Sequence, residues 1–116
     1  RTGAITNQRV LFQFTETEGY PDGMTSDAVG NLWIAHWGGA RVTQRSAITG
    51  KLLATYQTQA YQTSACCFGG KELKDLYVTT AQVNLTDDQQ AAFTDSGHLL
   101  KLQLESPGAP THAFAG

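Results

Sequence analysis

Asp22 and the short motif around it are the residues of this sequence best suited to chemistry. Pro21, Asp22 and Gly23 precede an apolar run that extends from Leu32 to Ala35. A carboxylate at the mouth of a strand can act as a general base, or its oxygens can bind a hard divalent cation. The tripeptide is also typical of a simple turn, because proline presets φ and glycine tolerates positive φ. The motif alone leaves both interpretations open.

The other acidic residues and the histidines do not suggest a set of partner ligands. Asp27 is expected at the turn end of a strand, Asp75 at the entrance of another, and Asp87 and Asp88 in the first turn of a helix. We interpret His36 as structural or solvated rather than as a ligand. Because a hard cation needs several oxygens, no complete metal site is expected within one copy of the chain.

Nucleophilic catalysis finds little support. Ser64 lacks the glycines of a nucleophile elbow and has no obvious base. Cys66 and Cys67 are adjacent, and neighbouring residues of a strand point to opposite faces, so they are poorly placed to form a disulfide. We interpret both as buried, small apolar residues rather than as reactive thiols. Trp33 and Trp37 are expected to fill space in the core.

Composition narrows the class of protein. The chain has 116 residues and a formal net charge of −2, which suits one domain, residues 1–116, with a modest core. No basic run indicates a nucleic-acid or membrane partner, and no apolar stretch reaches the roughly 20 residues that span a bilayer. The first residues lack the apolar core of a secretory signal. With no disulfide framework, these features predict a soluble protein of the cytoplasm.

The chain is expected to be β-structure almost throughout. Short runs rich in apolar and β-branched residues are bounded by glycine or polar residues, which is typical of an antiparallel meander. The predicted strands are residues 9–14, 24–28, 32–37, 41–47, 52–56, 64–68, 75–80 and 98–104.

One short helix is predicted between the last two strands. Thr86 and Gln89 have the spacing of a capping box, in which each side chain satisfies the backbone N–H of the other residue. Asp87 and Asp88 suit the positive end of the helix dipole. We expect a surface helix within a loop.

A repeat relates the two halves of the chain. Leu32-Trp33 and Leu76-Tyr77 are 44 residues apart and begin similar strands. A period of about 40–45 residues, with up to four strands in each repeat, is typical of β-propeller blades.

Many short motifs of the chain resemble, in order and approximate spacing, the C-terminal part of the SMP-30/gluconolactonase/regucalcin family. The motifs are Pro-Asp-Gly at residues 21–23, Asn-Leu-Trp at 31–33, Gly-Gly-Ala-Arg-Val at 38–42, Thr-Gly-Lys at 49–51, Cys-Cys-Phe-Gly-Gly at 66–70, Leu-Tyr-Val-Thr-Thr-Ala at 76–81, and the ending at 108–110 and 114–116. The sequence departs from the family at residues 43–48, where an apolar anchor and a turn Asp and Pro are missing. Compared with the other predicted strands, the packing of this strand is therefore the least supported by the resemblance.

The resemblance implies a six-bladed β-propeller that hydrolyses sugar lactones or related esters. It also implies a divalent cation (calcium, zinc or magnesium) held by a Glu near the start of the family's chain, an Asn in its middle and the Asp of the Pro-Asp-Gly motif. Only that Asp carries over, as Asp22, which becomes the candidate catalytic residue and metal ligand. The other two positions would lie upstream of Arg1.

These inferences predict an all-β fold: a partial six-bladed propeller of about two four-stranded blades, preceded by one strand. We expect the fragment to be inactive as a lone monomer, because two family ligands are missing. Exposed blade faces are expected to drive homo-oligomerisation. The alternative function is a non-catalytic, propeller-derived module for binding or self-assembly.

Overall fold

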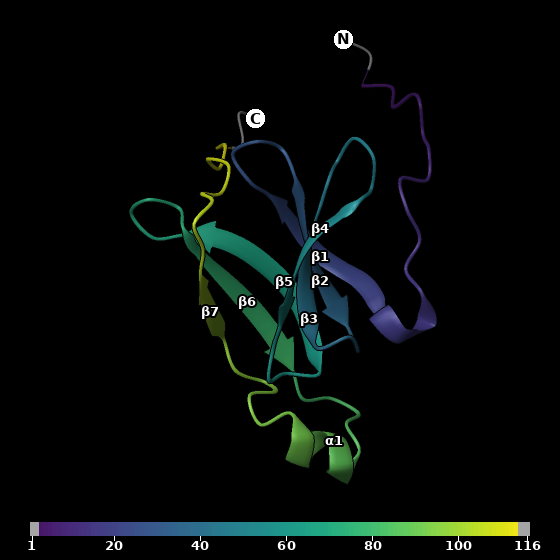
Figure 1. The fold of residues 1–116 in the computed structure, drawn as a ribbon, viewed down its shortest axis with the longest axis vertical. Coiled ribbons are helices and arrows are strands. Elements are labelled where there is room, and N and C mark those ends of the chain that lie inside the picture. The colour runs from purple at the N-terminus through teal and green to yellow at the C-terminus, as the bar shows by residue number, and fades with distance from the viewer. Residues whose placement is uncertain (1–2, 114–116) are drawn as a thin grey trace.

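The computed structural model describes residues 3–113, which form two antiparallel sheets and little other regular structure (Figure 1). The first sheet contains four strands in sequence order: β1 (Tyr20–Ser26), β2 (Leu32–Trp37), β3 (Arg41–Arg45) and β4 (Leu52–Gln57). The second contains three: β5 (Gln62–Gly69), β6 (Asp75–Ala81) and β7 (Leu100–Gln103). Each sheet is a meander, since every strand pairs with the next along the chain.

The meander was predicted correctly, but the first predicted strand was wrong. Residues 9–14 form no strand, and a short 3-10 helix, η1 (Glu16–Glu18), follows them. No described strand lies along residues 9–14 to pair with their backbone groups, and an unpaired segment is not a strand whatever its composition. In the described chain the second sheet has the three strands that were predicted for it, one fewer than a full four-stranded blade, and the motif at residues 114–116 lies outside the described part of the chain.

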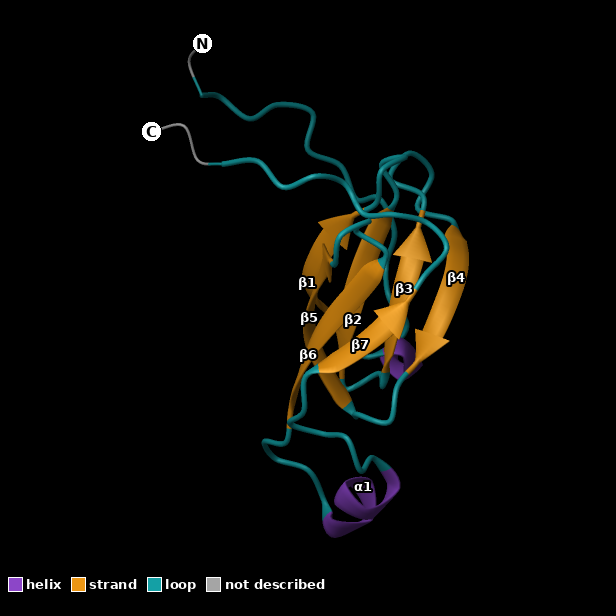
Figure 2. Ribbon diagram, turned by 90° about the vertical axis from the view of Figure 1, so that its left-hand side faces the viewer, coloured by secondary structure: helices purple, strands orange, loops and turns teal. Residues whose placement is uncertain are grey.

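Helix α1 (Asp87–Ala92) has the predicted capping box. The backbone N–H of Gln89 donates to the hydroxyl of Thr86 over 3.2 Å, and the backbone N–H of Thr86 donates to the side-chain carbonyl of Gln89 over 3.0 Å. The helix lies in the long connection from β6 to β7, beyond the ends of both sheets (Figure 2). It therefore covers neither sheet face.

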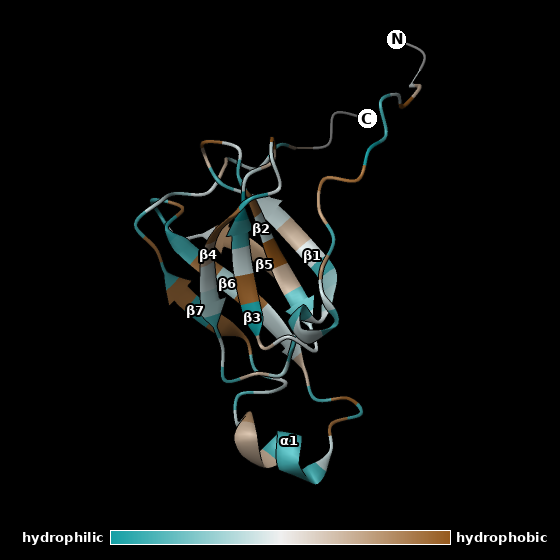
Figure 3. Cartoon of the chain, turned by 45° about the vertical axis from the view of Figure 1, so that its right-hand side comes forward, coloured by the Kyte–Doolittle hydropathy of each residue, from teal (hydrophilic) through white to brown (hydrophobic). Residues whose placement is uncertain are grey.

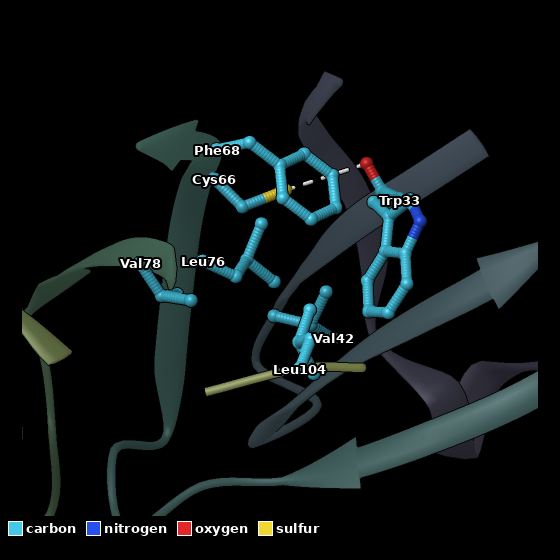
Figure 4. Packing of buried hydrophobic residues seen from close by; sticks show 7 residues of the cluster. All are labelled: Trp33, Val42, Cys66, Phe68, Leu76, Val78 and Leu104. Carbon is cyan, nitrogen blue, oxygen red and sulfur yellow. Dashed lines mark hydrogen bonds between the residues drawn. The ribbon is translucent and has the colours of Figure 1, made fainter. Parts of the chain in front are cut away.

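The hydrophobic core lies between the two sheets. In β6 the buried Leu76 and Val78 alternate with more exposed residues. Strand β3 contributes a hydrophobic segment between hydrophilic ends (Figure 3). The ring of Trp33 meets the ring of Phe68 edge to face, with centroids 5.4 Å apart. The buried cluster consists of Trp33, Val42, Cys66, Phe68, Leu76, Val78 and Leu104 (Figure 4). This packing fixes β2 of one sheet against β5 and β6 of the other.

The adjacent cysteines point to opposite faces of β5, as predicted, and both are free thiols. Cys66 is buried in the core and its thiol contacts the carbonyl oxygen of Trp33 at 3.3 Å. Burial raises the pKa of the Cys66 thiol to about 12. Cys67, however, is exposed on the outer face of the sheet, so the interpretation of both as buried residues was wrong for Cys67.

The far face of the first sheet is covered by the N-terminal segment. The guanidinium of Arg45 pairs with the carboxylate of Glu18 at 2.8 Å and lies 4.4 Å from the ring centroid of Phe12. The ring of Phe14 stacks on that of His36, with centroids 4.3 Å apart. Within residues 43–48, Arg45 is thus buried against this segment in the place of an apolar residue, although its Nε has no hydrogen-bond partner among the described residues.

His36 is fully buried beneath this segment. Its Nδ1 lies 2.7 Å from the backbone carbonyl of Glu18, and its Nε2 lies 2.8 Å from the hydroxyl of Thr43. A carbonyl only accepts, so Nδ1 carries the proton and donates to Glu18, while Nε2 accepts from Thr43. Both ring nitrogens are used, which confirms a structural role for His36.

Asp27 closes β1 and is equally well buried. Its carboxylate accepts from the indole N–H of Trp33 at 3.0 Å and from the side-chain amide of Gln44 at 2.7 Å. It also accepts from the backbone N–H of Asn31 at 2.9 Å and from that of Val29 at 3.1 Å. Burial raises the pKa of Asp27, but the hydrogen bonds from Trp33, Gln44 and Asn31 outweigh it, and the net pKa is lowered. One carboxylate thus joins β1, β2 and β3.

We predict that Asp27→Ala destabilises the protein by about 3 kcal/mol. The variant leaves the buried donors of Trp33 and Gln44 without an acceptor, and each unsatisfied buried group costs about 1–3 kcal/mol. Urea denaturation measures the difference. Asp88→Ala, on the exposed surface of α1, is the matched control and should change stability by less than about 1 kcal/mol. A loss below about 1 kcal/mol for Asp27→Ala would contradict this role.

Stability should also fall as the pH drops below about 6.5, the ordinary pKa of histidine. Burial and the nearby guanidinium groups of Arg41 and Arg45 lower the pKa of His36, although the Glu18 carbonyl and carboxylate oppose them. The neutral ring is therefore the folded form, and its contribution is complete above the unfolded pKa and lost as the pH falls towards the lower folded value.

The measurement is the free energy of unfolding between about pH 7.5 and pH 5, above the range where ordinary carboxylates titrate. His36→Gln should flatten the slope across this window, and His98→Gln, at an exposed histidine, should leave it. An identical slope in all three proteins would remove His36 as its source.

Candidate functional site

Asp22 lies within strand β1 and is exposed. The register of β1 against β2 shifts between Pro21 and Met24, where β1 has one more residue than its partner. The Pro-Asp-Gly motif is therefore a β-bulge rather than a simple turn, and a bulge redirects the side chains within it. Among the described residues, no hydrogen bond or ion pair engages the Asp22 carboxylate. It is free to accept a proton or to bind a ligand.

A second bulge interrupts the first strand of the other sheet. The register of β5 against β6 shifts between Thr63 and Ala65, so that Ser64 is the additional residue. Its hydroxyl donates to the backbone carbonyl of Thr79 over 3.1 Å and lies 2.8 Å from the Thr79 hydroxyl. Both first strands thus carry a polar side chain at a bulge.

The two bulges occupy equivalent positions. In the 44-residue repeat, strand β2 corresponds to β6. Each residue of β1 is then assigned to the residue of β5 whose partner on β6 corresponds to its own partner on β2. This assignment makes Asp22 equivalent to Ser64. By the same count Gly23 is equivalent to Ala65.

These equivalent residues are in contact. A Cβ placed on Gly23 would lie 2.5 Å from the Cβ of Ala65 and 2.8 Å from the carbonyl oxygen of Ser64, so only glycine permits the approach. When two similar sheets are related by a rotation, equivalent residues lie closest together near the rotation axis. The bulges, and with them Asp22 and Ser64, therefore lie nearest the axis that relates the sheets. In Figure 2 the first strands β1 and β5 lie on one side of the stack, with β4 at the other.

The other acidic candidates are held elsewhere. Asp27 is committed to its turn, and Asp87 and Asp88 lie in the first turn of α1, as predicted. The carboxylate of Asp75 lies 3.7 Å from the amine of Lys101. Within residues 3–113, no group of three His, Cys, Asp or Glu side chains could hold a metal ion. The residues present thus do not fit a complete divalent-cation site, since Asp22 would be the single carboxylate in it.

A groove of about 520 Å³ lies beside the motif but does not include Asp22. It separates the N-terminal segment from β1 and β2, and its lining includes Phe12, Phe14, Met24, Leu32 and Ile34. Because this lining is mostly apolar, the groove suits hydrophobic packing better than it suits a hydrophilic substrate.

Sequence reasoning identified Asp22 but did not identify Ser64 as its counterpart. Ser64 was weighed only as a nucleophile and was aligned with the strand that follows the motif. The correct alignment depends on the hairpin connections: five residues lie between Ser26 and its partner Leu32, but seven lie between Phe68 and its partner Leu76, so the first strands are offset by 42 residues rather than 44. The signal present in the sequence was Gly23, which has no side chain where the strands touch. In the described part of the chain, no helix is long and apolar enough to cross a membrane.

The chain is similar along its whole length to curated proteins. It is 36% identical over 117 residues to regucalcin of Danio rerio and 35% identical over 116 residues to a putative sugar lactone lactonase of Bacillus subtilis. All of this chain is covered, but the chain spans only 40% of the length of either relative.

Solved structures agree with these relatives. A luciferin-regenerating enzyme matches with a TM-score of 0.79 and 39% identity, over 91% of this chain and 36% of that one. Regucalcin of Agrobacterium tumefaciens, described as a calcium-binding protein, matches with a TM-score of 0.73 and 33% identity, over 82% of this chain and 32% of that one. The model of the SMP-30/gluconolactonase/LRE-like region matches residues 1–82. The chain therefore belongs to the SMP-30/gluconolactonase/LRE-like family.

Proposed function

We propose that this chain contributes Asp22 to a sugar-lactone hydrolase site, and that its two sheets are neighbouring blades of a six-bladed propeller. One observation carries the proposal: an exposed carboxylate without a partner lies at the bulge nearest the axis between the sheets. Membership of a family that includes a putative sugar lactone lactonase supplies the substrate class.

The chemistry available to Asp22 is general base catalysis. Its carboxylate would take a proton from a water molecule as the water oxygen attacks the lactone carbonyl. Collapse of the tetrahedral intermediate breaks the bond to the ring oxygen, which takes up a proton and leaves as a hydroxyl of the open acid. The reaction consumes one water and needs no oxidant or reductant.

The proposed site is incomplete in residues 3–113. The developing negative charge on the carbonyl oxygen needs a cation or fixed donors, and hydrolysis depends strongly on such stabilisation. Asp22 is an anion and cannot supply it. A divalent cation that stabilises this charge would need further ligands besides Asp22. The relatives' additional length could carry them. We expect the chain alone, as a monomer, to be inactive.

The test is complementation. The chain is mixed with the part of Danio rerio regucalcin that lies outside the matching region, and hydrolysis of gluconolactone is followed with and without added calcium. We expect metal-stimulated hydrolysis by the mixture and none by the chain alone. Asp22→Asn, which cannot accept the proton, should lower the rate at least about 100-fold.

Asp88→Asn, an exposed aspartate on α1, is the matched control and should leave hydrolysis unchanged. Equal rates for Asp22→Asn and the unaltered chain would remove Asp22 from the mechanism. Metal-stimulated hydrolysis by the monomeric chain would contradict the incompleteness of the site.

A second candidate function is self-assembly, and exposed apolar side chains favour it. Tyr20 and Met24 border the groove over the first sheet and are 75% and 55% exposed, while Leu99 near the outer face of the second is 66% exposed. Such surfaces usually bind a partner. We therefore expect copies of this chain to associate through the groove beside the first sheet and the outer face of the second sheet.

Sedimentation velocity over micromolar concentrations measures this association. Oligomers should form, and Met24→Lys should shift them towards monomer without unfolding the chain, because a charge would be buried at the contact. Val29→Lys, at an exposed turn, is the control and should have no effect. A folded monomer at all concentrations would rule out the self-assembly module.

A further inference from the structure

We propose that Ser64 binds a ring hydroxyl of the same polyhydroxylated lactone on which Asp22 acts. This inference rests on the proposed function for the substrate class, but it adds a second blade and a second residue to the site. Its basis is the equivalence of the two bulges, the contact between them and the hydrogen bonding of the Ser64 hydroxyl.

The bulges of β1 and β5 are in contact. Gly23 approaches the backbone of Ser64 and Ala65 so closely that a Cβ on Gly23 would overlap both. The thiol of Cys66 also lies 4.0 Å from the Gly23 carbonyl oxygen, which keeps this part of β5 beside β1. The two bulges that carry Asp22 and Ser64 are thus in contact across the junction of the two sheets, although the two residues do not pair with each other.

The Ser64 hydroxyl keeps one acceptor lone pair free. Ser64 donates its proton to the carbonyl of Thr79, over 3.1 Å. A serine oxygen has two acceptor lone pairs, and the Thr79 hydroxyl, 2.8 Å away, can occupy only one of them. Ser64 is half-buried and Thr79 is exposed, so the remaining lone pair can accept a hydroxyl from a ligand.

The Ser64–Thr79 pair suits an uncharged ligand that carries hydroxyl groups. The side chains of Ser64 and Thr79 are uncharged, and neither residue takes part in the described ion pairs. The pair therefore offers neutral hydrogen bonds only. A sugar hydroxyl is both a donor and an acceptor and matches such a pair. The carboxylate of Asp22 and the hydroxyl of Ser64 would then divide the work: one acts at the carbonyl, and the other orients the ring.

The experiment titrates the chain with gluconolactam, the ring-amide analogue of gluconolactone, which resists hydrolysis. In the unaltered chain we expect the amide resonances of Ser64 and Thr79 to shift. Ser64→Ala should weaken gluconolactam binding about 3- to 10-fold, the worth of one neutral hydrogen bond, and Ser64→Thr should restore it. Ser106→Ala, at an exposed serine near the C-terminus, is the matched control and should bind as the unaltered chain does.

Thermal unfolding of each variant separates binding from structure. Unchanged binding by Ser64→Ala, a loss of binding that merely follows a loss of folding, or no shift at Ser64 and Thr79 in the unaltered chain would each overturn the assignment. The proposed function fails separately: if gluconolactam binding depends on Ser64 but hydrolysis in the complemented protein does not depend on Asp22, the Ser64 assignment stands and the catalytic one falls.

Discussion

The close approach of β1 to β5 at Gly23 is the constraint on which the candidate site depends. A side chain at this position would overlap the backbone of the neighbouring sheet. Without that approach, the first strands would separate and Asp22 would lie on the edge of an isolated sheet. The core contact between Trp33 and Phe68 holds the sheets together, but it acts farther along the strands. The glycine therefore brings the polar bulges together, while the core supplies the stability that keeps them there.

Much of the fold follows from patterns within single segments. Alternation and turn residues predicted strands that overlap all seven described strands, with β1 the most displaced, and the spacing of Thr86 and Gln89 predicted the helix cap. The failures concern partners. Residues 9–14 have the composition of a strand, but in the described chain no strand pairs with their backbone. A local pattern cannot specify a partner, so it could not show whether this segment would pair.

The candidate site was predictable only in part, for the same reason. Asp22 was found because its motif is a local feature that resembles a family. Ser64 was missed because the first strands are offset by 42 residues, whereas the second strands are offset by 44. A fixed offset of 44 residues, taken from the second strands, would pair Asp22 with Cys66, which is buried in the core. The pairing register across the two hairpins, whose connections differ in length by two residues, is therefore the information that the periodicity of the sequence does not contain.

Two nearby carboxylates, Asp22 within β1 and Asp27 directly after it, show how position selects function. Asp27 is buried and accepts hydrogen bonds from Asn31 in the turn, from Trp33 on β2 and from Gln44 on β3, so its pKa is lowered. Asp22, five residues earlier, has the same chemistry but is exposed at a bulge and has no partner among the described residues. Exchanging their roles would require Asp27 to abandon the indole of Trp33, which would leave a buried donor unsatisfied. Asp27 thus cannot become a ligand at low cost, whereas Asp22 can bind a cation or substrate without losing a hydrogen bond to the protein.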